Sequence, residues 1–170
     1  MKQLREFPYD RAAAVRYAHQ WAYDFNPRYY NFTNIGGDCT NYASQCLYAG
    51  CGVMNFTETF GWYYLDLNHR APAWTGVIYL YNFLIRNEGP GPFATEVTID
   101  RVEPGDLCQL VIDQPDYQHT PVIVKVGETP TPDSILVAAH TYNVDNHPLS
   151  SYDYKKLRFL HIEGYRKWSE

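Results

Sequence analysis

The sequence lacks the features of two large classes of protein. It has no Lys- or Arg-rich run, and 14 basic against 19 acidic residues give a formal net charge of -5. Proteins that bind nucleic acids present a basic surface to the phosphates, so we expect no nucleic-acid partner. No apolar stretch approaches the roughly 20 residues that a membrane-spanning helix needs, so we expect no insertion into a membrane.

Signals of export and of a second domain are missing too. The N-terminal segment MKQLREFPYDRAAAV lacks the apolar run of a signal peptide. We therefore expect a soluble protein, either cytoplasmic or exported by a route that this chain does not show. No internal repeat, low-complexity tract or charged linker interrupts the 170 residues. Residues 1–170 are thus predicted to form a single domain, and a monomer is expected.

The four cysteines do not have the spacing of a zinc site. Cys39, Cys46, Cys51 and Cys108 include no C-x-x-C pair. Cys39 and Cys46 would lie on one helix, where a separation of two turns holds their side chains about 10 Å apart, too far for a disulfide. We expect four thiols, no metal and no cofactor.

Aromatic residues, in contrast, are abundant at 16% of the chain. Large rings that carry a polar edge suit a groove for a peptide or another polar polymer, and they equally suit a buried core. Trp62 and Trp74 stand in a Trp- and Tyr-rich segment, and we predict that they line a substrate groove.

Helices are predicted in the first half of the chain. Asp10 is a good N-cap for a helix over residues 11–25, which ends at Asn26-Pro27. Asp38 caps a second helix, CTNYASQCLYAG, with Gly50 as its left-handed C-terminal cap. A third helix is predicted from Pro72 through residue 87.

Strands are predicted in the second half. Short apolar runs bounded by Pro, Gly and Asp read VTID, LCQLVI, PVIVKV, ILVAAHTY and LRFLHIEGY. Helices followed by a meander of strands predict an α+β fold, in which the N-terminal helices pack on a C-terminal antiparallel sheet.

Cys39 is the predicted nucleophile, because it is the first residue of the second helix. A helix N-terminus carries partial positive charge and unpaired backbone N–H groups, which lower the pKa of a thiol. The same N–H groups can receive the oxyanion of an attacked carbonyl. The Gly-Gly-Asp that precedes Cys39 predicts a tight turn into the helix.

His119 is the predicted general base. It follows the polar hairpin DQPDYQ and begins the strand HTPVIVKV, so its ring is expected at the end of the sheet that faces the helix start. Four other histidines are expected to be structural or solvated: His19, His69, His147 and His161.

A third residue should orient the imidazole. We predict His140, which ends the run ILVAAH on the next strand, with Asn143 as the rival. Asp38 is a further candidate for the third residue or the oxyanion site, and Asn34, or Asn31, for an oxyanion donor in the preceding loop.

The segments YDRAAAVRYAHQWA, GGDCTNYASQCLYAG, PAWT, VEPGDL, H-x-P-V-I-V and A-H-T together resemble the "putative amidase" domain family, relatives of the CHAP and NlpC-type cysteine hydrolases. The resemblance runs from about residue 9 to residue 161, and the G-D-C-T-N segment is its most specific part. It implies a papain-like α+β fold and hydrolysis of an amide bond, often in cell-wall peptides, with Cys39 and His119 at the catalytic positions. Gln118 stands where the family usually has Asp, and Cys51-Gly52 replaces a Gly-Gly.

The leading hypothesis is therefore a cysteine amidase or peptidase that passes through a thioester and acts on a peptide or a peptidoglycan-like substrate. A silent glycan- or peptide-binding module, which uses the segment from Phe56 to Trp74, is the alternative from another class. An acyl transferase with the same triad is a third.

Overall fold

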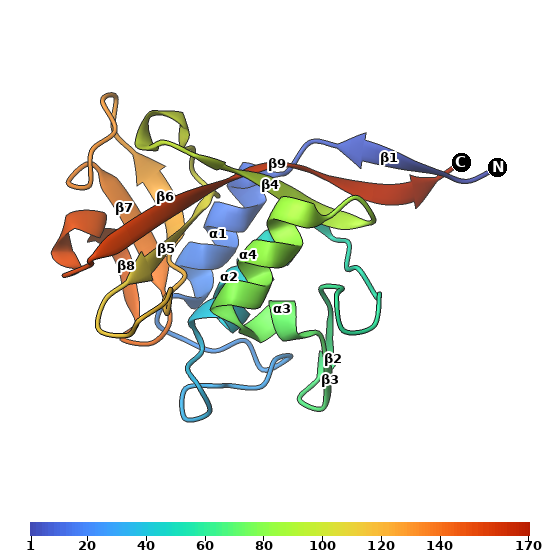
Figure 1. Ribbon diagram of the computed structural model, residues 1–170, viewed down its shortest axis with the longest axis horizontal. Helices are drawn as coiled ribbons and strands as arrows, with labels where there is room; N and C mark the ends of the chain where they lie inside the picture. The colour runs from blue at the N-terminus through green and yellow to red at the C-terminus, as the bar shows by residue number, and fades with distance from the viewer.

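The structure is a computed structural model that describes all 170 residues, and it confirms an α+β fold with a large antiparallel sheet. Figure 1 shows the helices gathered against one face of the sheet. The helical elements are α1 (Arg11–Trp21), α2 (Cys39–Cys51), α3 (Pro72–Thr75), α4 (Val77–Arg86) and the short 3₁₀ turns η1 (Ile99–Arg101) and η2 (Leu149–Ser151). None of the helices is long and apolar enough to cross a membrane.

The main sheet has seven strands in the order β1-β9-β5-β6-β7-β8, with β4 also paired to β9. Their bounds are β1 (Gln3–Phe7), β4 (Gly91–Val97), β5 (Leu107–Val111), β6 (Val122–Val126), β7 (Ile135–Ala139), β8 (Val144–Pro148) and β9 (Lys156–Ser169). Every pair is antiparallel, as the sequence predicted. The hairpin β2 (Tyr64–Asp66) and β3 (His69–Arg70) lies apart from this sheet.

The helix α2 begins at Cys39, as predicted, but ends two residues later than expected. Gly52, with φ 67°, is its left-handed C-terminal cap, and its N–H donates to Tyr48 O. Gly50 has another role, because a Cβ at this position would lie 2.3 Å from the Tyr9 ring. The glycine therefore lets the chain around Tyr9 approach α2 closely.

Other elements also differ from the sequence prediction. The first helix, predicted over residues 11–25, ends at Trp21. The predicted strand VTID is wrong beyond its first residue, because β4 ends at Val97 and η1 follows. The helix predicted from Pro72 is interrupted at Gly76, whose extended backbone (φ -111°, ψ 128°) separates α3 from α4. The strand predicted over 135–142 ends at Ala139, and a turn leads into β8. The N-terminal strand β1, which sequence analysis missed, pairs with the end of β9, so the two termini lie together (Figure 1).

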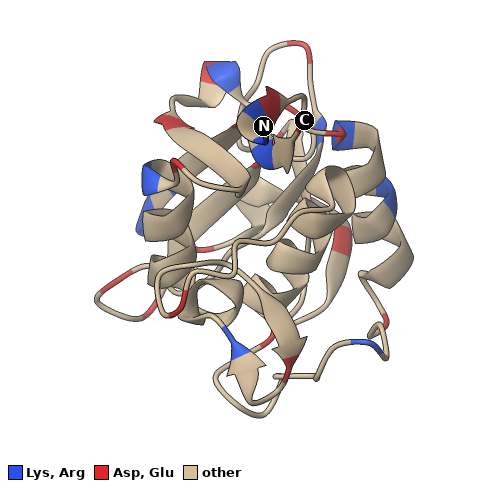
Figure 2. Ribbon diagram, turned by 90° about the vertical axis from the view of Figure 1, so that its right-hand side faces the viewer, with Lys and Arg blue, Asp and Glu red and all other residues tan.

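Two apolar clusters pack on the two opposite faces of the sheet. Side chains alternate along a strand, so that Val122 and Val124 of β6 face the helices while Ile123 faces the opposite side. The first cluster joins α1, α2 and α4 to the sheet, and the second lies beneath the loops that contain η1 and η2. Acidic and basic residues are interspersed along the ribbon in Figure 2, without a basic stretch.

A buried carboxylate ties α1 to the sheet. Asp106 Oδ1 accepts from Arg11 at 2.7 Å and from the Ile162 backbone N–H at 2.9 Å, while Oδ2 accepts from the Glu103 N–H at 2.8 Å. His161 Nδ1 lies 2.8 Å from the same Oδ2. Asp106 therefore shapes its own turn and fixes where α1, and with it α2, meets the strands.

Candidate active site

The Cys39 thiol lies at the first turn of α2 and against the segment that contains His119. Its Sγ is 3.9 Å from the backbone oxygen of Gln118, which immediately precedes His119, and 3.7 Å from Thr40 Oγ1. Only 6% of the Cys39 surface is exposed. The fold thus brings the predicted nucleophile to the start of the chain segment that bears the predicted base.

The backbone amides around Cys39 remain free of helical hydrogen bonds. The first helical bond of α2 runs from Tyr42 N to Asp38 O, at 3.0 Å, and the amides of Cys39 and Thr40 donate to no backbone carbonyl. Unpaired amides at a helix start are the donors that can stabilise an oxyanion.

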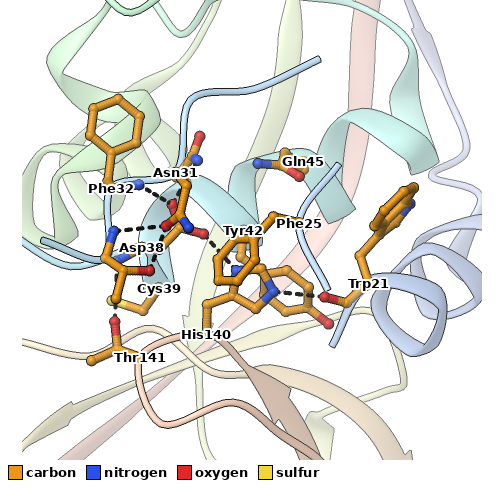
Figure 3. Close-up of polar contacts among 12 residues, drawn as sticks. Trp21, Phe25, Asn31, Phe32, Asp38, Cys39, Tyr42, Gln45, His140 and Thr141 are labelled. Atoms are coloured by element: carbon orange, nitrogen blue, oxygen red, sulfur yellow. Dashed lines mark hydrogen bonds and ion pairs between the residues drawn. The ribbon is translucent and has the colours of Figure 1, made fainter. Parts of the chain in front are cut away.

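Asp38 holds the loop that leads to the nucleophile. Its Oδ1 accepts from the Phe32 backbone N–H at 2.8 Å and from Asn41 Nδ2 at 2.9 Å, and its Oδ2 contacts His140 Nδ1 at 2.5 Å (Figure 3). The Asp38 N–H donates to Thr141 Oγ1 at 3.1 Å. Asp38 is the N-cap residue of α2, as predicted, but its side chain makes no bond to the α2 amides and instead anchors distant segments.

His140 belongs to this anchor and not to a chain of hydrogen bonds through His119. Its Nδ1 contacts Asp38, and its Nε2 contacts Trp21 O at 2.7 Å. Figure 3 shows the ring enclosed between Tyr42 and Phe25, with ring centroids 4.1 and 4.6 Å away. Both ring nitrogens are occupied, so the prediction that His140 orients His119 is wrong.

His119 is buried at the end of the sheet. Its backbone pairs with Leu110, and its ring packs against Tyr152 with a centroid separation of 5.4 Å. The imidazole makes no hydrogen bond to another residue. Burial lowers the pKa of His119 to about 4, so the ring is neutral at physiological pH.

The resting thiol is neutral as well, against the expectation of a depressed pKa. Burial raises the pKa of Cys39, and the nearby charge of Asp38 acts in the same direction. Hydrogen bonds from the Thr120 backbone and from Thr40 favour the thiolate and oppose this effect only in part. Desolvation therefore outweighs these hydrogen bonds, and the site rests as neutral thiol and neutral imidazole.

A row of polar side chains behind Cys39 was not found from the sequence. Thr40 Oγ1 lies 3.1 Å from Thr120 Oγ1, and Gln109 Nε2 donates to Thr120 Oγ1 at 3.3 Å and to Val77 O at 2.9 Å. These bonds connect α2, the sheet and α4 around the thiol. Each of the two threonines directly follows a predicted site residue, Thr40 after Cys39 and Thr120 after His119. This adjacency was the one sequence feature that could have indicated their contact.

The remaining predicted residues lie outside a shared site. Asn143 makes no side-chain hydrogen bond, and Asn34 is exposed in the turn before Gly36. Trp62 and Trp74 are fully buried, with ring centroids 4.6 Å apart, and their Nε1 groups donate to Ser44 Oγ and Asn41 Oδ1. The prediction that these two rings line a substrate groove is wrong, because they form the core beside α2.

All four cysteines are free and buried. Cys46, Cys51 and Cys108 lack the contacts of Cys39, and burial raises their pKa values, for Cys51 to about 12. Only Cys39 lies at a helix N-terminus beside the segment that carries His119.

Two comparisons with known proteins found matches. A family model described as "Putative amidase domain" matches residues 8–162. A Bacillus subtilis (strain 168) protein described as "Uncharacterized protein YhbB" is 32% identical over 143 residues, which is 82% of this chain and 43% of that protein. The chain thus spans less than half the length of this curated relative. No solved structure matches the chain.

Proposed function

The chain belongs to the family described as "Putative amidase domain", and from this membership we propose that it is a papain-like cysteine hydrolase that cleaves an amide bond with Cys39 and His119. The observation that carries the proposal is the position of the thiol. Sγ lies at a helix start with unpaired amides and 3.9 Å from the backbone oxygen of Gln118, next to His119.

The first half of the reaction forms a thioester. His119 accepts the Cys39 thiol proton as Sγ bonds to the carbonyl carbon of the substrate amide, and the carbonyl oxygen becomes an oxyanion. The free amides at the start of α2 donate to this oxyanion. The C–N bond then breaks, and the leaving amine takes the proton from His119.

The second half hydrolyses the thioester. His119 accepts a proton from water as the water oxygen bonds to the acyl carbon. The C–S bond breaks, the carboxylic acid leaves, and the proton on His119 returns to Sγ. Because the pKa of His119 is about 4, its imidazole is unprotonated above that pH and able to accept a proton.

The substrate class follows from the reaction and the family. We propose a peptide or peptidoglycan-like substrate, with cell-wall stem peptides as the first candidates. The cell-wall assignment rests on the family resemblance and not on a feature of this site.

Mutation of the nucleophile tests the proposal. Cys39→Ala should abolish turnover of a cell-wall digest, measured by mass spectrometry of new termini, and should abolish the acyl adduct on the protein. Cys51→Ala, at the other end of the same helix, is the matched control and should keep activity. Turnover by Cys39→Ala within tenfold of the wild type would contradict the assignment.

Iodoacetamide labelling of Cys39 no faster than that of Cys51 would favour a binding module.

A further inference from the structure

The predicted base has no orienting partner among the residues that sequence analysis proposed. Both ring nitrogens of His140 are occupied by Asp38 and Trp21, and Asn143 makes no side-chain hydrogen bond. The side chain that packs on the His119 ring is Tyr152, from the segment between η2 and β9. A second ring, that of His147, packs on Tyr152 edge to face, at a centroid distance of 5.3 Å.

The Tyr152 hydroxyl is the single buried side-chain polar atom in the chain that has no hydrogen-bond partner. Buried polar groups in native proteins are almost always paired, so an unpaired one needs an explanation. The hydroxyl also lies within the field of the nucleophile. Burial raises the pKa of Tyr152, and the proximity of Cys108 and Cys39 acts in the same direction.

The proton transfer creates a need for a hydrogen-bond acceptor at this place. Neutral imidazole has one N–H donor, whereas the imidazolium has two. When His119 takes the Cys39 proton on one ring nitrogen, the other N–H is a charged donor inside a buried site. A buried cation is stable only when its donors are paired.

We propose that Tyr152 is the positioning residue of His119, with its Oη accepting the imidazolium N–H that faces away from Cys39. This inference rests on the proposed function of the Cys39 and His119 pair. The proton of Sγ moves to His119, Tyr152 keeps its own proton, and the new hydrogen bond holds the ring in the orientation that returns the proton to the leaving group. The two rings already pack with centroids 5.4 Å apart, and the proposed bond requires the His119 side chain to rotate until this N–H reaches Oη.

The test uses the variant Tyr152→Phe, which keeps the ring and removes the hydroxyl. The rate of Cys39 alkylation by iodoacetamide is followed by site-resolved mass spectrometry between about pH 5 and pH 10, where thiol and thiolate both contribute. We expect the His119-dependent rate near neutral pH to fall by about tenfold. Such a loss is part of the acceleration of about 10²–10⁴-fold that a general base provides. The rate at high pH, where the thiolate forms unaided, should not change.

Two comparisons separate positioning from packing. In the His119→Ala background, Tyr152→Phe should have no further effect on alkylation. Tyr154→Phe, a ring packed on the same apolar cluster, should match the wild type. The melting temperature of Tyr152→Phe should stay unchanged or rise, since the lost hydroxyl has no partner.

The results distinguish this inference from the proposed function. A wild-type rate for Tyr152→Phe, or an equal loss with and without His119, would overturn the role of Tyr152. If His119→Ala itself leaves Cys39 alkylation unchanged, the Cys39 and His119 pairing fails, and the inference with it.

Discussion

At the scale of single residues, Asp38 shows how the side chain before Cys39 fixes the start of α2. Its carboxylate joins the Phe32 amide, Asn41 and His140, and its backbone N–H bonds to Thr141. Three segments therefore meet at the residue before Cys39: the loop at Phe32, the first turn of α2, and the turn at residues 140–141. The direction in which the thiol leaves the backbone is set by this anchor, which is buried from water.

Removal of the Asp38 carboxylate should damage both stability and activity. Asp38→Ala leaves the Phe32 N–H and one nitrogen of His140 buried without partners, so we expect the free energy of unfolding to fall by about 3 kcal/mol. Urea titration measures this change. Asp133→Ala, on an exposed turn, is the control and should lie within about 0.5 kcal/mol of the wild type. A small loss in Asp38→Ala would show that the anchor is dispensable for the fold.

At the scale of elements, the turn between β7 and β8 is held in an unfavourable backbone conformation. Thr141 and Tyr142 both have positive φ, 64° and 58°, in a tight hairpin that favours Asn and Gly. Thr141 contributes the oxygen that accepts the Asp38 N–H. Tyr142 is 91% exposed, and its side chain makes no hydrogen bond, so nothing within the chain offsets its strain.

Tyr142→Gly should therefore stabilise the protein. A left-handed conformation costs a residue other than glycine about 1–2 kcal/mol, and the greater freedom of glycine in the unfolded chain returns part of this gain. We expect a net gain of about 0.5–1 kcal/mol, which is a rise in melting temperature of about 1–4 °C for a chain of this size. Calorimetry checks the value.

Asn146→Gly, in the following strand β8, is the graded control. Asn146 also has positive φ, 48°, but Asn tolerates that region well, so the gain should be smaller. A melting temperature of Tyr142→Gly below that of the wild type would mean that the Tyr142 side chain stabilises the fold.

At the scale of the whole molecule, burial of His119 links stability to pH. Its folded pKa of about 4 lies below the value of about 6.5 in the unfolded chain. As the pH falls, the unfolded chain binds this proton first. The contribution of His119 to the free energy of unfolding therefore keeps its full value above about pH 6.5 and decreases progressively as the pH falls to about 4.

The size of this effect can be measured against a variant that does not titrate. A difference of about 2.5 pKa units corresponds to about 3 kcal/mol. We expect the wild type to lose that much more stability than His119→Gln between about pH 7 and pH 4, in urea titrations at each pH. Parallel losses in the two proteins would show that His119 is not buried as a neutral group.

Local sequence signals were enough to place the elements that carry the site. Gly-Gly-Asp before an amphipathic run predicted a helix that begins at Cys39, and the structure confirms it. Short apolar runs between turn residues predicted the strands β5, β6 and β7 and their antiparallel order. These features depend on residues close together in the chain, where capping, turn chemistry and periodicity act directly.

The partners of the site residues depended on the tertiary structure. His140 bonds to Asp38 across 102 positions, and Tyr152 packs on His119, through strand registers and loop paths that no local pattern encodes. The raised pKa of Cys39 has the same origin, because its largest cause is desolvation, which comes from packing by the whole fold. The burial of Trp62 and Trp74 also depended on tertiary packing. An aromatic ring suits a groove and a core equally, and only the elements packed around it determine which it occupies.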